Sequence, residues 1–392
     1  MPVKNRSRWD CNDADLQWRY TSIVAVAMSS NSTPLLEVRD LIVARGGVEV
    51  VRVPSFSINE NETMALIGPN GSGKSSLLLS IACLLRPTSG HITFRGALLN
   101  YESGATSYRR KLAMVFQEPL LFDTTVFENV ASGLKIRGLP GQEIRELVGA
   151  SLDHFKIAHL SGRSARKISG GEAQRTSLAR AFVTRPEIIL LDEPFVALDP
   201  PTRQALTEDL ELVLRDSGTA AIITTHDQVE ALRLADQMVV MQHGCIVQSG
   251  TPSDVMSKPV NEFVANFVGM ENVYSGFIRE AGSGLLKLAI GNQTMEIPGE
   301  GSPGGRVTLC IHPDHVVVTT TDPNRHTSAR NVFPCKVVRI VPFGLFNKVY
   351  LDCGFTLVAS ITNQSLALLG LKPTNTVYAL IKATAVHLFR KG

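Results

Sequence analysis

The sequence predicts an α/β domain built around a parallel sheet, followed by a smaller all-β domain. A glycine-rich loop stands between an apolar strand and a helix at residues 63–85, and an apolar run at 188–191 ends in two carboxylates. Such continuous apolar runs are typical of parallel strands that are buried on both faces. Beyond residue 270, short β-rich runs alternate with turn signals such as Gly-Ser-Pro-Gly-Gly at 301–305, so this part should consist mainly of strands.

The glycine-rich loop fits G-x-x-x-x-G-K-[ST], the pattern of a phosphate-binding P-loop. Backbone N–H groups of such a loop point at a phosphate, and the following helix N-terminus adds partial positive charge. Lys74 would reach the β- and γ-phosphates of a nucleotide, and Ser75 would place its hydroxyl on Mg²⁺. The predicted cradle comprises Gly68, Pro69, Asn70, Gly71, Ser72, Gly73, Lys74, Ser75 and Ser76.

Two carboxylates, Asp192 and Glu193, directly follow the apolar run. A carboxylate at the carboxyl end of a parallel strand lies beside a P-loop in the same sheet. Asp192 would hold Mg²⁺ through water, and Glu193 is placed to polarise an attacking water as general base. The acidic pair and the P-loop together predict a nucleotide-hydrolysing α/β P-loop domain.

A Ser-Gly-Gly-Glu sequence opens a predicted helix at residue 169. Ser169 can cap that helix, and Gly170 and Gly171 allow its backbone to approach an anion. The alternative is a helix cap without any ligand. Glu172 adds negative charge near a bound nucleotide, which should slow closure unless Arg175 or another cation screens it.

The order of six motifs resembles the nucleotide-binding subunit of ABC transporters over about residues 35–260. The resemblance implies ATP and Mg²⁺ as cofactors, with Gln117 sensing Mg²⁺ and the attacking water, and His226 contacting the γ-phosphate. It implies that Asp199 lies at a dimer interface. The motifs are Walker A at 68–75, Gln117 after a strand, Ser-Gly-Gly at 169–171, Leu-Leu-Asp-Glu-Pro at 190–194, Ala-Leu-Asp at 197–199 and Thr-His-Asp at 225–227.

The position of the adenine-stacking aromatic of this family falls near Arg45. Its planar guanidinium could stack on the base instead, or Arg45 could be a solvated loop residue. The chain has one Walker A motif and one signature. In the family the signature of one subunit closes over ATP held by the other, so the resemblance implies a head-to-tail homodimer.

The C-terminal sequence resembles the molbindin-type module, which binds molybdate or tungstate, over about residues 327–389. A tetrahedral dianion favours backbone N–H groups, hydroxyls and cations as ligands. Alternatively, the module is a dimerisation scaffold whose pocket is unused. By motif position the oxyanion ligands would be Ser328, Arg330, Ser365, Lys382 and Ala383.

These resemblances predict the domain limits. Residues 1–33 are expected to form a poorly ordered extension, and 34–268 the ATPase domain with a helical subdomain at about 118–168. Residues 269–392 should form an OB-like, molbindin-like β-barrel with an oxyanion-binding, regulatory role.

The expected function is that of the ATPase subunit of an ABC importer for tungstate or molybdate. The implied partners are membrane permease subunits, docking near residues 117–135, and a periplasmic or extracellular solute-binding protein. The chain would then lie on the cytoplasmic face of the membrane. The alternatives are an importer ATPase for sulfate, iron or polyamines, and a non-transport ABC ATPase acting on DNA or ribosomes.

Composition limits the other classes of function. The 392 residues carry a formal net charge of +3, which gives no indication of a nucleic-acid partner. No apolar run approaches the 18 residues of a membrane helix, so another chain must cross any membrane. Without a C-x-x-C pair, the cysteines are expected to be free thiols packed in a reducing compartment. They are Cys11, Cys83, Cys245, Cys310, Cys335 and Cys353.

Overall fold

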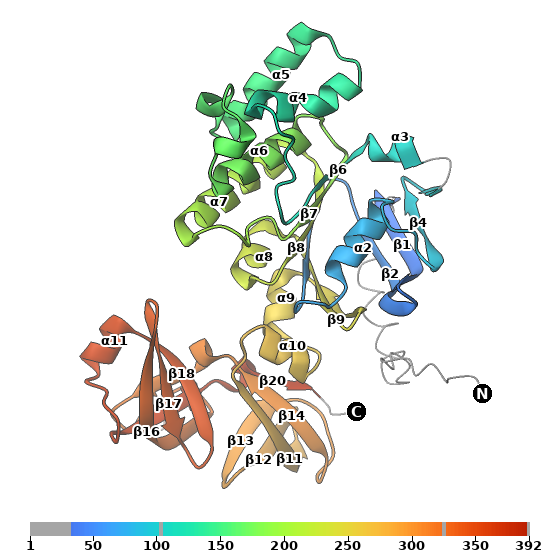
Figure 1. Cartoon of the computed structure of the whole chain (residues 1–392). Coiled ribbons are helices and arrows are strands. Elements are labelled where there is room, and N and C mark those ends of the chain that lie inside the picture. Colours follow the sequence, from blue (N-terminus) through green and yellow to red (C-terminus); the bar gives the residue numbers. More distant parts are fainter. Residues whose placement is uncertain (1–32, 102–104, 324–326, 390–392) are drawn as a thin grey trace, which may run out of the picture. The chain divides into compact units, whose positions relative to one another are not determined.

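The chain divides into two compact units, residues 1–253 and 254–392 (Figure 1). The structure is a computed structural model that describes residues 33–101, 105–323 and 327–389. Residues 1–32 of the predicted extension therefore lie outside the described residues. The division falls within α9 (Pro252–Ser257), whereas the predicted domain boundary at 268/269 comes after both α9 and α10 (Glu262–Phe267).

A ten-stranded sheet forms the centre of the first unit, with the order β5-β4-β1-β2-β10-β9-β3-β8-β7-β6. Strands β9, β3, β8, β7 and β6 run parallel, and β1, β2, β4 and β5 pair antiparallel. Strands β9 and β10 form a hairpin across residues 243–244. The strands are β1 (Leu36–Arg45), β2 (Val48–Ile58), β3 (Thr63–Ile67), β4 (Ser89–Phe94), β5 (Ala97–Leu98), β6 (Leu112–Val115), β7 (Ile188–Asp192), β8 (Ala220–Thr225), β9 (Gln237–Gln242) and β10 (Cys245–Gly250).

Successive residues of β7 enter opposite hydrophobic cores, which explains its continuous apolar sequence. Ile188 and Leu190 pack in the core that contains α2, whereas Ile189 and Leu191 pack in the core that contains α6 and α7. A strand covered on both faces needs apolar residues at every position. The helices of this unit are α2 (Lys74–Ile81), α3 (Ala105–Arg109), α4 (Val126–Ile136), α5 (Gly141–His154), α6 (Gly170–Phe182), α7 (Pro200–Ser217) and α8 (Gln228–Leu234).

The segment predicted to be a helical subdomain contains α4 and α5. Thr125 caps α4 by accepting a hydrogen bond from the backbone N–H of Glu128 at 3.2 Å. The buried faces of both helices pack in the core shared with α6 and α7. This arrangement places the α4–α5 segment next to the strands that end at the candidate site.

The second unit confirms the predicted all-β, OB-like region and consists mainly of two five-stranded antiparallel sheets, β13-β12-β11-β14-β20 and β15-β19-β16-β17-β18. The sheets exchange strands, because β20 at the chain end joins the first and β15 joins the second. One hydrophobic core includes residues of both sheets. The strands are β11 (Asn272–Gly282), β12 (Leu285–Ile290), β13 (Gln293–Pro298), β14 (Arg306–Ile311), β15 (Val317–Thr319), β16 (Asn331–Phe343), β17 (Phe346–Asp352), β18 (Thr356–Thr362), β19 (Thr376–Ile381) and β20 (Val386–Phe389), with α11 at Asn363–Leu368.

The prediction that the cysteines are free is wrong for Cys245, which is disulfide-bonded, and for Cys335 and Cys353, which form a disulfide with each other. Strands β16 and β17 pair antiparallel with Lys336 opposite Asp352. Cys335 precedes Lys336 and Cys353 follows Asp352, so these two cysteines lie opposite each other. Their Cα atoms are 4.3 Å apart, close enough for a disulfide without moving the backbone. Sequence spacing did not indicate this pair because only the strand register brings it together.

Candidate functional site

Three motifs meet at the carboxyl ends of the parallel strands β3, β7 and β8. The last residue of β3, Ile67, is in register with Thr225 of β8, and Asp192 of β7 is in register with Thr224. The P-loop, the acidic pair and the His226 loop therefore leave the sheet at one edge. This is the edge where open α/β sheets bind ligands.

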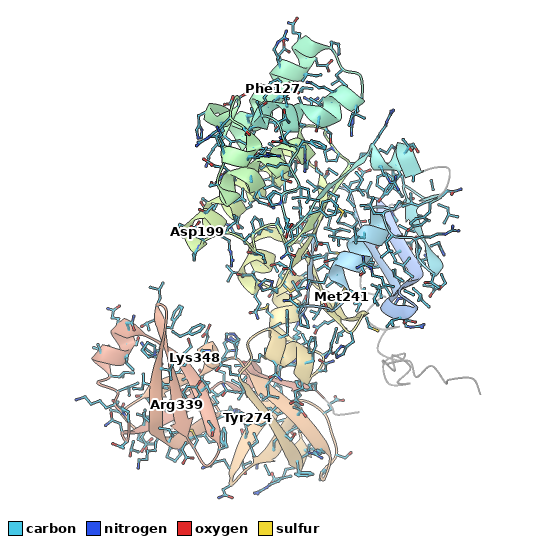
Figure 2. All side chains as sticks on the ribbon, in the orientation of Figure 1. Phe127, Asp199, Met241, Tyr274, Arg339 and Lys348 are labelled. Atoms are coloured by element: carbon cyan, nitrogen blue, oxygen red, sulfur yellow. A yellow bond between two sulfur atoms is a disulfide. The ribbon has the colours of Figure 1, made fainter. Side chains whose placement is uncertain are left out.

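Two P-loop glycines allow close approaches that a side chain would block. A Cβ on Gly68 would lie 2.3 Å from the backbone oxygen of Met241, whose position on β9 is marked in Figure 2. A Cβ on Gly73, which has φ 101°, would lie 2.7 Å from the backbone oxygen of Val50. The loop can therefore lie against β9 and β2 only with glycine at these two positions.

The Lys74 ammonium is held inside the loop. Only 4% of its surface is exposed, and Nζ donates to the backbone oxygens of Gly68 at 2.9 Å and Pro69 at 3.3 Å. Nζ also lies 3.5 Å from Oε1 of Glu193. Burial lowers the pKa of Lys74, and the Glu193 carboxylate opposes that shift. The cation is thus positioned for a phosphate that would replace the neighbouring carbonyls.

A hydroxyl and a carboxylate form the candidate magnesium position. Ser75 Oγ donates to Asp192 Oδ1 at 3.0 Å, and Thr224 Oγ1 donates to the same oxygen at 2.7 Å. The described residues contain no cluster of three or more His, Cys, Asp or Glu suited to a metal. One carboxylate with one hydroxyl suits Mg²⁺, which completes its octahedral coordination with water and phosphate oxygens.

One buried polar atom in the loop supports the same fit. Within the described part of the chain, Ser72 Oγ is buried and has no hydrogen-bond partner. Buried hydroxyls usually have a partner, so this one is available to a ligand. The residues present therefore fit a magnesium nucleotide.

Glu193 lies between the lysine and the histidine of the site. Its backbone has φ 45°, and its N–H donates to Thr224 O at 3.1 Å and to Thr224 Oγ1 at 2.9 Å. Glu193 Oε2 lies 3.5 Å from His226 Nδ1, and about half of the His226 side chain is exposed. The left-handed backbone turns the carboxylate out of the strand toward the loop.

Among the described residues, no hydrogen bond or ion pair joins Gln117 or Arg45 to these groups. Gln117 is exposed two residues after β6, the strand beside β7. Arg45 is exposed at the end of β1, where Gly46 and Gly47 form the turn into β2. The structure brings Lys74, Ser75, Asp192, Glu193 and His226 together and leaves these two candidates outside that group.

The Ser-Gly-Gly-Glu segment forms a capping box at the start of α6. Ser169 N donates to Glu172 Oε2 at 2.7 Å, and Glu172 N donates to Ser169 Oγ at 3.3 Å. The hydrogen bond that Ser169 N donates to the carboxylate, together with the Ser169 hydroxyl, lowers the pKa of Glu172. Of the cations that could screen this charge, Arg175 pairs with Asp209 and donates to the backbone oxygen of Phe155 at 3.1 Å, whereas Arg163 contributes to lowering the pKa of Glu172.

A hollow of about 530 Å³ lies between the start of α6 and the start of α7. Ser169, Gly170 and Gly171 line it together with Asp199, which caps α7 through Thr202 N at 3.1 Å and is marked in Figure 2. The P-loop residues do not line this hollow. Within one chain the signature and the P-loop thus form two separate surfaces.

The residues that hold the site side chains in place were not identified from the sequence. Thr224 binds both Asp192 and Glu193, and Thr225 donates to the buried Glu230. Arg203 of α7 lies 3.5 Å from Asp227, next to His226. The two consecutive threonines before the histidine were the only available signal, because the remaining contacts come from separate helices.

The oxyanion candidates lie at two ends of one sheet. Ser328 and Arg330 precede β16, and Lys382 and Ala383 follow β19. The start of β16 pairs with the end of β19, so these four lie at one end. Ser365 is in α11, which follows β18 at the end of the sheet where β16 turns into β17. A single chain therefore does not assemble all five residues.

Comparisons with known proteins identify the family. A model described as "ABC transporter" matches residues 51–196, and a TOBE domain model matches 327–388. A molybdate/tungstate import ATP-binding protein, WtpC of Pyrococcus horikoshii, is 38% identical over 341 residues, covering 86% of this chain and 95% of the relative. The chain belongs to the ABC transporter family.

Two further similarities extend this result. A spermidine/putrescine import ATP-binding protein, PotA of Mesorhizobium japonicum, is 34% identical over 351 residues, covering 88% of this chain and 93% of the relative. The solved structure of cbiO1 from Clostridium perfringens, part of the ABC transporter complex cbiONQ, has TM-score 0.55 and 29% identity. It covers 61% of this chain and 96% of that one.

The chain is an ATPase of the ABC type, with the fold expected for that family. Within the described ranges, no helix has the length and apolar character needed to span a bilayer.

Proposed function

We propose that this ABC ATPase is the ATP-binding subunit of an importer and hydrolyses ATP at the edge formed by β3, β7 and β8. The observation that carries the proposal is the position of the Glu193 carboxylate, between Lys74 at 3.5 Å and His226 at 3.5 Å. Lys74 binds the β- and γ-phosphates, Glu193 accepts the proton of the attacking water, and His226 contacts the γ-phosphate.

A bound Mg²⁺ would supply positive charge beside the phosphates. Ser75 and Asp192 would hold it, since their oxygens already lie 3.0 Å apart, and Gln117 would complete the site from the end of β6. Backbone N–H groups of the P-loop bind the phosphates without an added side-chain charge. Arg45 would stack on the adenine from the β1–β2 turn.

The functional unit is a head-to-tail homodimer. The signature residues Ser169, Gly170 and Gly171 line a hollow together with Asp199, and no P-loop residue lines that hollow. Both surfaces would contact one ATP only if the signature came from a second copy. The chain supplies one of each motif, so the dimer would hold two composite sites.

The proposed transported solute is molybdate or tungstate. The relative WtpC of P. horikoshii is named for molybdate and tungstate import, and 95% of its length matches this chain. The Arg330 and Lys382 cations lie at one end of the second sheet, as a dianion site requires. The importer would include membrane permease subunits and an outer solute-binding protein, with this chain on the cytoplasmic face and no nucleic-acid partner.

Polyamine import is the second candidate, because PotA relatives match over a comparable length. One contact is compatible with a cationic solute: Arg330 Nη1 lies 3.6 Å from Glu296 Oε2, so a carboxylate already occupies part of the basic end. A dianion would have to displace this carboxylate, whereas a polyamine would compete with Arg330 for it.

Deleting the gene for this chain in its own organism tests whether the transported solute is an oxyanion or a polyamine. We expect uptake of labelled molybdate or tungstate to fall to background, and labelled spermidine uptake to stay unchanged. Complementation with the wild-type chain should restore uptake, and complementation with Lys74→Ala should not. Loss of spermidine uptake alone would replace the oxyanion proposal by the polyamine one.

A further inference from the structure

A cluster of charged side chains lies between α7 and α8, beside the His226 loop. Arg203 belongs to the first turn of α7, and its N–H donates to the backbone oxygen of Asp199 at 2.9 Å. Its guanidinium faces two carboxylates. Nη1 lies 3.5 Å from Asp227 Oδ2, and Nε lies 3.9 Å from Glu230 Oε1. Arg203 thus links the helix that Asp199 caps to the residues around His226.

The same two carboxylates hold the backbone on both sides of His226. Glu230 is 7% exposed and accepts a hydrogen bond from Thr225 Oγ1, on the N-terminal side of the histidine. Asp227 N, on the C-terminal side, donates to Thr225 Oγ1 at 2.9 Å. Asp227 Oδ1 caps α8 through Val229 N at 2.8 Å. The orientation of the His226 loop therefore depends on Glu230, Thr225 and Asp227.

One contact in this cluster is incomplete. Among the described residues, Arg203 Nε is buried and has no hydrogen-bond partner. Its 3.9 Å separation from Glu230 Oε1 is too long for a hydrogen bond. A buried N–H of a charged group left unpaired is costly. Burial also raises the pKa of Glu230, against the effects of Thr225 and Arg203. A small movement of the first turn of α7 toward α8 would satisfy both groups.

We propose that Arg203 and Glu230 are positioning residues that align His226 with Glu193. When Nε of Arg203 closes onto Glu230, the Thr225–Asp227 backbone is fixed and the His226 ring is held at the Glu193 carboxylate. Because Arg203 follows Asp199 by one helical turn, movement of the Asp199 end of α7 changes this contact. The inference rests on the proposed hydrolytic role of His226 and Glu193.

The chain offers a matched control for this proposal. Arg233 of α8 pairs with Glu211 at 2.7 Å and with Glu208 at 3.3 Å, both on α7. It therefore joins the same two helices as Arg203, but within the described part of the chain its hydrogen bonds and ion pairs do not reach the Thr225–Asp227 loop. Arg233→Gln should remove an α7–α8 ion pair without changing the alignment of His226.

Steady-state kinetics of the full-length protein give the first test. Glu230→Gln and Arg203→Lys should lower kcat about tenfold to a hundredfold, as expected for a misplaced catalytic group, and leave ATP affinity within about twofold. Arg233→Gln should retain wild-type kcat. In a His226→Ala background, Glu230→Gln should have no further effect, because residues that act through one group are not additive. If the double variant instead lost kcat by the product of the two single losses, the proposal would be overturned.

A spectroscopic readout separates positioning from hydrolysis. In histidine-labelled full-length protein, the His226 ring resonance is assigned by its loss in His226→Ala. That resonance should shift in Glu230→Gln and Arg203→Lys and stay in place in Arg233→Gln. An unshifted resonance in both test variants would overturn the positioning role. A shift combined with wild-type kcat in His226→Ala would instead contradict the proposed hydrolytic role of His226.

Discussion

Glu193 is the residue on which the proposed chemistry depends most. Its carboxylate lies within 3.5 Å of both the Lys74 ammonium and the His226 ring, and its backbone is bonded twice to Thr224. A group held in this way needs little rearrangement to act on a water at the γ-phosphate. Replacing the carboxylate by its amide keeps the shape and removes the base.

We therefore expect Glu193→Gln to bind ATP as the wild type does and to hydrolyse it at least about a hundredfold more slowly, the usual contribution of general base catalysis. ATP-bound dimer should accumulate because hydrolysis no longer resets it. Phosphate release and size-exclusion chromatography with ATP would measure both effects. Glu146→Gln, on the exposed face of α5, is the control. Wild-type turnover in Glu193→Gln would show that another group is the base.

Glu172 stabilises α6 as well as contributing charge to the signature. Because it completes the capping box with Ser169, Glu172→Ala should destabilise the protein by about 1 kcal/mol, and Glu172→Gln, which keeps an acceptor oxygen but not the charge, should destabilise it by less. Hydrogen bonds from Ser169 lower the pKa of Glu172, so its contribution is complete above the ordinary glutamate pKa and is lost as pH falls through the lowered value. Denaturant unfolding at neutral and acid pH would measure this: the Ala variant should approach the wild type in acid. An equal difference at both pH values would contradict it.

At the scale of elements, the segment between β6 and α4 is a shaped surface loop. Asn129 is fully buried; its Oδ1 accepts from Phe122 N at 2.7 Å, and its Nδ2 donates to Phe122 O and Thr125 O, both at 3.0 Å. The loop is thereby held with Leu120 and Phe122 exposed, each at 58%. Arg180 lies over the Phe122 ring at 5.8 Å. Exposed apolar side chains on an ordered loop are suited to docking.

We expect the membrane subunit to dock on residues 117–135. Phe122→Cys in the assembled transporter should cross-link to the permease, because the ring is exposed and the loop is ordered. Leu345→Cys, which is 79% exposed in the turn between β16 and β17 and so at least as accessible, is the control and should not cross-link. Mass spectrometry would identify the linked peptides. Cross-links that form only from the β region would place the docking surface elsewhere.

The Cys335–Cys353 disulfide joins β16 to β17 inside the β core. The bridge spans 18 residues, and closing a loop of that size stabilises a fold by about 2–4 kcal/mol. The double substitution Cys335→Ser, Cys353→Ser should therefore lower the unfolding midpoint of the second unit, as should a reductant on the wild type. Calorimetry of the full chain measures this. A reductant should not affect the double variant further in this unit; unchanged stability on reduction would contradict the bridge.

At the scale of the whole molecule, the candidate oxyanion residues are divided between two ends of one sheet. Ser365 lies at the end opposite Arg330 and Lys382, so a complete set requires a second copy of the chain. An anion shared between copies would favour one arrangement of the dimer. A coupling of about 1–3 kcal/mol would be enough to change affinity about 5- to 150-fold.

We predict that millimolar molybdate or tungstate lowers ATPase activity of the assembled transporter, and that Arg330→Ala with Lys382→Ala removes this inhibition. Lys287→Ala, whose partner is Glu280 in the first β sheet, is the control and should retain it. Activity is measured against anion concentration at constant ionic strength. Inhibition that persists in the double variant would locate the inhibitory site elsewhere, and none in the wild type would leave the β region as a scaffold.

Local signals in the sequence determined the P-loop, the apolar strand before Asp192 and the helix cap at Ser169. Each depends on adjacent residues: glycines that permit positive φ, a run covered on both faces, and a hydroxyl three residues before a glutamate. The family resemblance then assigned ATP chemistry to these elements. The predicted strands and helices therefore agree closely with those found around the site.

The tertiary structure decided the relations between distant residues. The register of β16 with β17 pairs Cys335 with Cys353, and the crossing of α7 and α8 places Arg203 beside the His226 loop. The two-ended division of the oxyanion candidates follows from strand order in the second sheet. Such contacts depend on how separate elements pack. The local sequence around a residue does not indicate which distant side chain it will contact.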